Sequence, residues 1–549
     1  MASSANKHSD AHEFNYTMMQ AFEWYTPDGG VHWDWLASNA KRFADMGITA
    51  VWLPPPTKSS SPESTGYDIY DLYDLGEFAH PRDEKAGLTP AHRTKYGTRE
   101  QLEAAMKALR DNGIAIYIDA VLNHKAGADE LQTFKVRRVN SDNRNEIIDD
   151  EPFDIDGWTR FTFPGRGDKH SSFQWGFEHF TGVDWDQKGE QKAIFRIEGD
   201  NKHWASDTDR ENGNFDYLMF SDIDHAHGDV KDDMLKWGRW MLRNFPVAGF
   251  RFDAVKHISR EFIHDFVAAV RDEARQLRKE RGLEAVDETE GPIAFSVGEF
   301  WKDSVDSCIE YLDKFGDEQF SLFDAPLHYN FAEAGAAGSS YDLRKVFDGT
   351  IVQRRPIDAV TLVENHDTQA GQSLQSPVPA AFKPLAYSLI LLRQDGYPCV
   401  FLGDLEGCNA KGKEGDEGYA QPMADLEKFL KARKHFAYGV QRDYMDHANC
   451  IGWTREGVEA MEPSDEERGA GKKGTERKEG CAVVMCNGDG EGTKWMEVGK
   501  GHAGRKFVDV IGWYQGQVEI NQDGWAEFKC HPRSVAVWVP EDSDKRQFF

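Results

Sequence analysis

Residues 249–257 read GFRFDAVKH, a short apolar segment that ends in polar and charged residues. Three other segments are built in the same way: IAIYIDAVLNH at 114–124, IAFSVGEFW at 293–301 and AVTLVENHD at 359–367. Buried parallel strands are nearly continuous in branched and aromatic residues, and polar groups at their C-terminal ends gather at one mouth of a parallel barrel. The four segments therefore predict a barrel with an active site at that mouth.

Eight segments of this kind occur between Tyr16 and Gly439, separated by amphipathic stretches with helical periodicity. The predicted strands are YTMMQAFEW (16–24), ITAVWLPP (48–55), IAIYIDAV (114–121), FRFDAV (250–255), IAFSVGEF (293–300), SLFD (321–324), AVTLVE (359–364) and YPCVFLGD (397–404). Eight alternating strand and helix units predict the α/β fold of a TIM (β/α)8 barrel.

Two further regions depart from this alternation. The segment 123–227, rich in Gly, Asp and aromatic residues, is far longer than an ordinary connection between a strand and its helix. It predicts an irregular β-rich domain inserted after the third strand. From residue 438 onward, short alternating strands with glycine-rich turns predict a C-terminal antiparallel β-sandwich. The predicted domains are 1–122 with 228–437, then 123–227, then 438–549.

The chain carries 65 Lys and Arg against 94 Asp and Glu, a formal net charge of -29. A field of this sign repels phosphate backbones and anionic lipids, so nucleic acid and membrane are excluded as expected partners. The N-terminus lacks the apolar core of a signal peptide, and the seven cysteines show no metal-type spacing. We expect a soluble, cytoplasmic monomer with free thiols.

Three acids stand at the ends of predicted strands. Arg251 and Asp253 are two residues apart, so a strand points both side chains the same way, and a guanidinium stabilises a neighbouring carboxylate. Glu299 precedes Phe300 and Trp301, an apolar setting that favours the protonated form, and Asp367 follows His366. Retaining glycoside hydrolysis needs one carboxylate nucleophile and one acid that later acts as base, so the set predicts Asp253 as nucleophile and Glu299 as general acid.

These motifs, DAVLNH, GFRFDAVKH, GEFW and VENHD, resemble in content and order the signature regions of the α-amylases of glycoside hydrolase family 13. YLMFSDID and GWTREG resemble the bacterial liquefying-type enzymes, and a chain without a signal also resembles forms found inside filamentous fungi. The resemblance implies endohydrolysis of α-1,4-glucosidic bonds in starch, glycogen or maltooligosaccharides. It gives Asp253, Glu299 and Asp367 as nucleophile, acid/base and transition-state stabiliser.

The resemblance also implies substrate contacts and a calcium site. The substrate-binding residues would be Tyr67, His124, Arg251, Lys256, His257 and His366. Calcium would be held by Asn123, Asp216, Asp222 and the backbone carbonyl of His257, and hard cations do take several oxygen ligands. Thr181 and Ala226 stand where a further metal cluster of the liquefying enzymes would need Asp, so we expect a single calcium ion.

Two other functions remain open at this stage. A sugar hydroxyl can replace water in attacking the same intermediate, so a transglycosylase or an α-1,6-acting relative on this scaffold is one alternative. A glucan-binding protein without activity is the other, although all three acids are present.

Overall fold

The computed structural model describes residues 14–79, 92–282, 294–409, 412, 415–460 and 476–549. At its centre, eight strands form a closed barrel in the order β1-β16-β15-β14-β13-β12-β5-β2, and every neighbouring pair is parallel. The barrel strands are β1 (Met18–Gln20), β2 (Ala50–Trp52), β5 (Ala115–Ala120), β12 (Gly249–Phe252), β13 (Phe295–Gly298), β14 (Ser321–Phe323), β15 (Ala359–Leu362) and β16 (Tyr397–Phe401). The predicted TIM barrel is confirmed, with each strand shorter than its apolar segment.

Helices surround this barrel and end where the sequence provides capping residues. Thr98 and Gln101 form a capping box at the start of α3, and Gly47 ends α1 in the left-handed conformation. The α-helices of this region are α1 (His32–Met46), α3 (Arg99–Asp111), α4 (Gly228–Asn244), α5 (Arg260–Glu280), α6 (Val305–Asp313), α7 (Ala325–Ala337), α8 (Ile351–Arg354), α9 (Lys383–Leu392), α10 (Leu402–Glu406) and α11 (Leu426–Phe436). A short hairpin joins β3 (Lys58–Ser59) to β4 (Ile69–Asp71).

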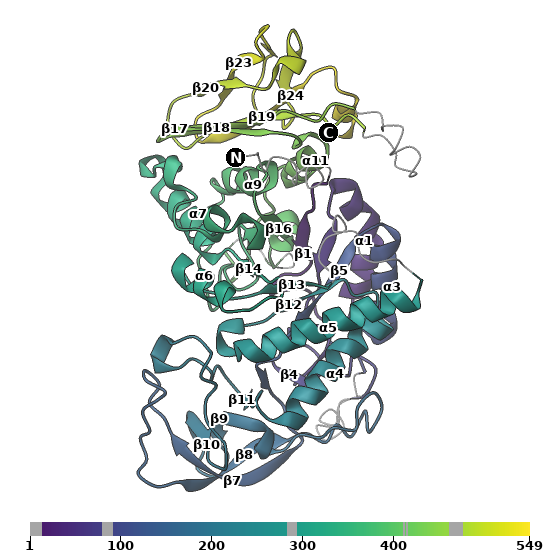
Figure 1. Cartoon of the computed structure of the whole chain (residues 1–549), viewed down its shortest axis with the longest axis vertical. Coiled ribbons are helices and arrows are strands. Elements are labelled where there is room, and N and C mark those ends of the chain that lie inside the picture. The colour runs from purple at the N-terminus through teal and green to yellow at the C-terminus, as the bar shows by residue number, and fades with distance from the viewer. Residues whose placement is uncertain (1–13, 80–91, 283–293, 410–411, 413–414, 461–475) are drawn as a thin grey trace, which may run out of the picture.

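The segment after β5 forms a six-stranded sheet in the order β6-β11-β9-β10-β7-β8. Its strands are β6 (His124–Lys125), β7 (Glu130–Arg138), β8 (Phe153–Arg160), β9 (Phe180–Asp186), β10 (Gln191–Ile197) and β11 (Ser221–Ile223). In Figure 1 this sheet lies at one end of the molecule, beyond the barrel and below α4. The chain enters it directly from β5 and leaves it directly into α4.

The C-terminal region is antiparallel and occupies the opposite end of the molecule (Figure 1). One sheet has the order β17-β18-β19-β24-β21-β22, and a two-stranded sheet pairs β20 with β23. The bounds are β17 (Gln441–His447), β18 (Cys450–Arg455), β19 (Cys481–Cys486), β20 (Gly492–Glu497), β21 (Lys506–Asp509), β22 (Val518–Glu519), β23 (Trp525–Cys530) and β24 (Ser534–Pro540). A C-terminal antiparallel β domain is therefore confirmed, while the domain boundaries at 122/123, 227/228 and 437/438 stay a prediction.

The seven cysteines are buried and free. Within the described residues, each helix is too short or too polar to cross a bilayer.

Gly298 closes β13 immediately before Glu299 and lies against a crowded wall. A Cβ atom there would come within 2.6 Å of the Phe320 ring and 3.0 Å of Val255. Gly228, the first residue of α4, has open space at the corresponding position. Because Gly298 has no side chain, Phe320 and Val255 can pack directly against the backbone beside Glu299.

We predict that Gly298→Ala lowers the free energy of unfolding by about 1–3 kcal/mol, because overpacking displaces the Phe320 ring. Gly228→Ala is the matched control and should leave stability nearly unchanged. Differential scanning calorimetry on both variants checks this. Equal melting temperatures for the two variants would contradict the packing argument.

Candidate active site

A single guanidinium joins three carboxylates at the C-terminal mouth of the barrel. Arg251 is fully buried, and its Nη1 donates to Asp119 Oδ1 at 2.8 Å and to Asp253 Oδ1 at 2.7 Å. Its Nη2 donates to Glu299 Oε2 at 2.6 Å. The sequence-predicted nucleophile and acid are therefore held close together by the same side chain.

The barrel's register explains this convergence. Arg251 on β12 pairs directly with Asp119 on β5, and residues opposite one another on parallel neighbours point to the same side of the sheet. Asp253 follows two residues later and keeps that direction. The next residue, Ala254, has a φ of 48°, unusual for a residue with a side chain, and its N–H donates to Glu299 Oε2 at 3.2 Å. The left-handed conformation of Ala254 thus accompanies a hydrogen bond from its backbone N–H to Glu299.

Burial determines the protonation of the two other acids. Desolvation, together with the nearby charges of Asp253 and Asp367, raises the pKa of Glu299 from 4.5 to about 8, although Arg251 opposes the shift. Burial, followed by the charge of Asp253, raises the pKa of Asp367 to about 7. At neutral pH Glu299 can therefore carry the proton that a general acid must donate.

Aromatic rings form one wall beside the acids. Tyr67 lies parallel to His366, with ring centroids 5.0 Å apart and an interplanar angle of 7°. The Tyr67 hydroxyl donates to Asp119 Oδ2 at 2.9 Å, and the Trp52 indole donates to the same oxygen at 2.9 Å. His366 Nε2 lies 3.4 Å from Asp367 Oδ2. Asp119 thus fixes both the guanidinium and the aromatic wall.

The other predicted substrate-binding residues have hydrogen-bond partners within the protein. His124 Nε2 donates to the Tyr67 carbonyl at 2.7 Å, and its Nδ1 lies 3.3 Å from the Asn123 amide, so both ring nitrogens already have protein partners. Arg251 lies beneath the carboxylates and is fully buried. Lys256 donates to the Trp301 carbonyl at 3.2 Å, and His257 Nδ1 lies 2.7 Å from the Phe215 carbonyl. Their roles in binding sugar stay predictions.

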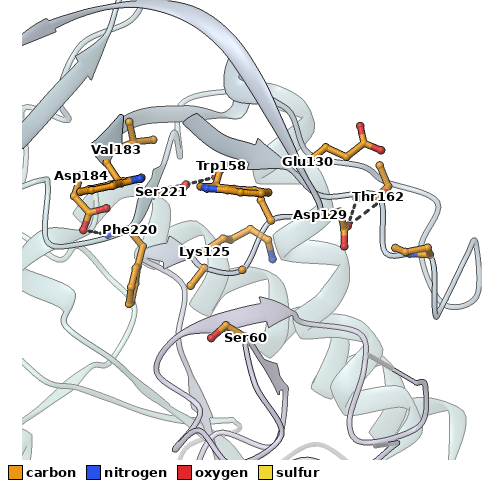
Figure 2. Close-up of a pocket in the computed structure, with 15 residues that line it drawn as sticks. Ser60, Lys125, Asp129, Glu130, Trp158, Thr162, Val183, Asp184, Phe220 and Ser221 are labelled. Atoms are coloured by element: carbon orange, nitrogen blue, oxygen red, sulfur yellow. Dashed lines mark hydrogen bonds between the residues drawn. The ribbon is translucent and has the colours of Figure 1, made fainter. Parts of the chain in front are cut away.

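A groove of about 890 Å³ lies between the inserted region and Ser60 of the β3–β4 hairpin, and the three predicted catalytic acids do not line it. Phe220 lines the groove, and its ring centroid lies 5.5 Å from that of His124, so one predicted sugar-binding residue borders it. Figure 2 shows Trp158 and Phe220 of the inserted region on one side and Ser60 on the other, with Asp184 beside Phe220. Trp158 and Trp185 are 40% and 37% exposed, and both indoles donate to Gln187 Oε1, at 3.2 and 3.1 Å. Large flat rings held open to solvent in this way suit a sugar chain.

The predicted calcium ligands come together below the mouth. Asn123 Nδ2 lies 3.5 Å from Asp222 Oδ1, while Asn123 Oδ1 is buried and has no hydrogen-bond partner among the described residues. Burial is the main cause that raises the pKa of Asp216 to about 8 and that of Asp222 well above its ordinary value, and each is further raised by other carboxylates nearby. Crowded buried carboxylates beside an unused amide oxygen fit a hard cation.

An internal cation lies next to this set. Lys202 Nζ donates to Asp224 Oδ2 at 2.5 Å and also contacts the Glu178 carbonyl, and its side chain is only 9% exposed. The Thr181 hydroxyl donates to Asp222. The Lys202 ammonium therefore satisfies Asp224, an acid that could otherwise help to hold a second ion.

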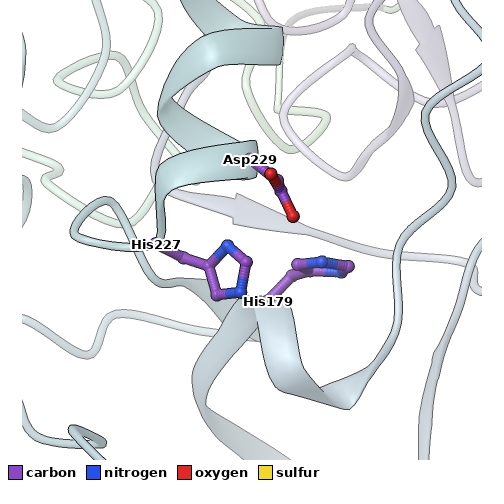
Figure 3. Close-up of side chains that lie close together, drawn as sticks. All are labelled: His179, His227 and Asp229. Carbon is purple, nitrogen blue, oxygen red and sulfur yellow. The ribbon is translucent and has the colours of Figure 1, made fainter.

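A separate cluster contains two imidazoles. One ligand atom from each of His179, His227 and Asp229 lies within 4.8 Å of the others (Figure 3). The Gly176 N–H donates to His179 Nδ1 at 2.9 Å, which leaves the proton of the neutral ring on Nε2. Metal-ligating histidines instead donate from their second nitrogen, and calcium prefers oxygen, so we assign no metal here.

Sequence reasoning missed Asp119, Gln20 and Lys202. Asp119 was detectable, because it is the one charged residue within the otherwise apolar β5 segment, as Arg251 is within β12. Gln20 is also a polar residue in an apolar strand segment, but nothing in the sequence indicates that it contacts His366, and Lys202 stands in no motif with recognisable spacing.

Fold and site together define a carbohydrate-active hydrolase of the TIM-barrel class. The catalytic domain of the α-amylase family matches residues 33–460, and the α-amylase C-terminal domain matches residues 483–539. The chain is 44% identical to the glucan 1,4-alpha-maltohexaosidase of Bacillus sp. (strain 707), over 96% of this chain and 92% of that protein. It is 41% identical to the cytoplasmic alpha-amylase of Escherichia coli (strain K12), over 96% and 99%.

Among solved structures, an alpha-amylase from Geobacillus thermoleovorans complexed with acarbose aligns with a TM-score of 0.56 at 15% identity, over 97% of both chains. This likeness concerns the fold alone. The family match and the curated relatives carry the further conclusion: the chain belongs to the α-amylase family, and the predicted hydrolase class is confirmed.

The Lys202 ammonium should be essential for the stability of the inserted region. Removing one partner of a buried ion pair costs about 3–5 kcal/mol, so Lys202→Met should unfold at a clearly lower temperature. Lys41→Met breaks an exposed pair whose side chains are 77% and 60% accessible, and should cost less than about 1 kcal/mol. Thermal unfolding monitored by fluorescence compares the two variants. Equal melting temperatures would show that the Lys202 ammonium does not stabilise the inserted region.

Proposed function

We propose that this enzyme cleaves internal α-1,4-glucosidic bonds with retention of anomeric configuration, through a covalent glucosyl-enzyme intermediate. The observation that carries the proposal is the Arg251 guanidinium, which binds Asp253 and Glu299 at 2.7 and 2.6 Å. Retaining enzymes place the nucleophile and the acid close together, whereas inverting enzymes leave room for a water between them.

In the first step Asp253 attacks the anomeric carbon while Glu299 gives its proton to the leaving oxygen. The raised pKa of Glu299 supports this role, because the acid must be protonated at the start of the cycle. In the second step the ionised Glu299 removes a proton from water, which releases the sugar from Asp253. Asp367 and His366 hydrogen-bond the sugar ring as positive charge develops, and Tyr67 packs against it.

The groove extends this proposal to the substrate. Its two exposed indoles and its carboxylate Asp184 provide apolar faces and a hydrogen-bond acceptor for a neutral oligosaccharide. A chain of several glucose units is therefore the proposed substrate, such as starch, glycogen or maltooligosaccharide. His124, Lys256 and His257 are proposed to shape the site around it.

Calcium is proposed to bind Asn123, Asp216, Asp222 and the His257 carbonyl. The unused Asn123 Oδ1 and the buried carboxylates support one ion at this place. When bound it neutralises these acids and ties the inserted region to the barrel.

Cytoplasmic location is proposed from the cytoplasmic relative in Escherichia coli, and a monomeric state stays a prediction.

The first test follows maltoheptaose hydrolysis by proton NMR. We expect products that appear as the α-anomer, the outcome of retention. Glu299→Gln should lower kcat by about 10²–10⁴, because the proton donor is lost while the side-chain volume is kept. Asp253→Asn should abolish turnover.

Glu280→Gln, at the exposed end of α5, serves as the matched acid-to-amide control and should be fully active. Initial β-anomeric products would overturn the retaining mechanism. Products longer than maltoheptaose would instead identify a transglycosylase, and binding without cleavage a glucan-binding protein.

Calcium removal provides a second test. A ligand whose free concentration is a thousand times its dissociation constant stabilises the folded state by about 4 kcal/mol. EDTA should therefore lower the melting temperature, and added Ca²⁺ should restore it. Asp222→Asn should melt at the same temperature with and without EDTA. An unchanged melt of the parent enzyme, together with no calcium by elemental analysis, would rule the site out.

A further inference from the structure

Gln20 is the last residue of β1 and points its amide at the active-site histidine. Its side chain is 1% exposed, and its Nε2 lies 3.0 Å from His366 Nδ1. The opposite ring nitrogen, His366 Nε2, faces Asp367 Oδ2 at 3.4 Å. One histidine thus lies between a strand-end amide and a predicted catalytic carboxylate.

The His366 ring is neutral at working pH. Burial, followed by the positive charge of Arg251, places its pKa well below the ordinary 6.5. Rings of Phe22, Trp52 and Tyr67 pack around it with centroids 5.1, 5.7 and 5.0 Å away. A neutral imidazole carries one proton, so its two nitrogens must take opposite roles, one donor and one acceptor.

The environment of each nitrogen decides where that proton lies. Nε2 faces Asp367 Oδ2, and in the ionised form, which prevails above the pKa of about 7 of this carboxyl, the oxygen only accepts hydrogen bonds, so the proton is favourable on Nε2. Nδ1 must then accept, and the Gln20 NH2 group is the donor. In this orientation the Gln20 Oε1 is buried without a partner among the described residues. The flipped amide would instead leave an NH2 group with two unused donors, and buried unpaired N–H groups are rarer than unpaired carbonyls.

We propose that Gln20 is a positioning residue that holds His366 as the Nε2–H tautomer, so that this nitrogen donates toward Asp367 and toward a sugar hydroxyl in the transition state. The inference rests on the proposed function of Asp367 and His366. Gln20 does not touch the reacting atoms itself. Its effect passes through one hydrogen bond to the histidine.

Charged groups reach His366 from several elements. Asp367 lies on its own loop, Arg251 comes from β12, and the Tyr67 hydroxyl is bound to Asp119 from β5. Arg251 acts on the pKa of the ring and does not distinguish between its two nitrogens in the way that a hydrogen bond does. The Gln20 amide therefore provides the local selection of the tautomer.

Two substitutions of similar size separate this role from simple packing. Gln20→Met removes the donor, so kcat should fall roughly tenfold, the value of one hydrogen bond, with little change in KM and no change in the shape of the pH profile. Gln20→Glu behaves differently with pH. Its protonated carboxyl can donate to Nδ1, whereas its ionised carboxylate draws the proton to Nδ1 and imposes the wrong tautomer. Its activity relative to the parent should therefore be highest in acid and fall as pH rises.

Gln369→Met is the matched control, because Gln369 is also a buried glutamine near the mouth and bonds Glu23 and the Trp24 N–H. As the control for Gln20→Met, it should lower the melting temperature without the roughly tenfold fall in kcat. If Gln20→Glu keeps the parent's pH profile, or if Gln369→Met lowers kcat as much as Gln20→Met does, the proposal fails.

A measurement on the parent enzyme keeps the inference testable if the variants do not fold. Two-bond 1H–15N correlation of enzyme labelled in histidine, with His366→Gln to assign the signals, reports the tautomer directly. An Nε2–H pattern for His366 is expected, and an Nδ1–H pattern would overturn the proposal. Inactivity of the parent on starch would contradict the proposed function instead, and would leave this spectrum unaffected.

Discussion

The active site depends on the buried guanidinium of Arg251. A fully buried cation is tolerated only where opposite charges and hydrogen bonds offset its desolvation, and here carboxyl groups from three successive barrel strands accept hydrogen bonds from both of its terminal nitrogens. The dependence is mutual, because without Arg251 the same acids would repel one another in a desolvated space. The register of β5 against β12 is thus a requirement of the chemistry, since a shift of one residue would turn Asp119 away.

The same segment that shapes the acids also begins the inserted region. After β5 the chain passes through Asn123 and His124, and β6 pairs with β11, which carries Asp222. His124 holds the Tyr67 carbonyl on one side, while Asn123 reaches both His124 and Asp222 on the other. The proposed cation-binding residues and the aromatic wall beside the acids are therefore joined by one stretch of backbone. A change in the charge balance at the proposed cation site is therefore expected to reach this wall through two adjacent residues, Asn123 and His124.

Much of this was predictable from sequence, for a definite physical reason. A parallel strand buried on both faces must be apolar along its length, so the polar residue that ends it stands out, and eight such segments predicted the barrel and the place of Asp253, Glu299 and Asp367. Family resemblance added the metal and sugar contacts. The sequence could not predict hydrogen-bond partners that lie far apart in the chain and meet only in the folded structure. Lys202 reaches Asp224 from a loop in the inserted region, and Gln20 reaches His366 across 346 residues of sequence.

Several polar groups around the site share a property that follows from burial. Arg251, His366 and Asp222 are each nearly inaccessible, and a buried polar group has few ways of being satisfied. One neighbour then decides its charge, its tautomer or its orientation. In water the imidazole would exchange between tautomers and the carboxylates would titrate near their ordinary values. Inside this barrel the side chains that exclude water also choose among these states, so the residues that contact substrate are only part of what sets the reactivity of the site.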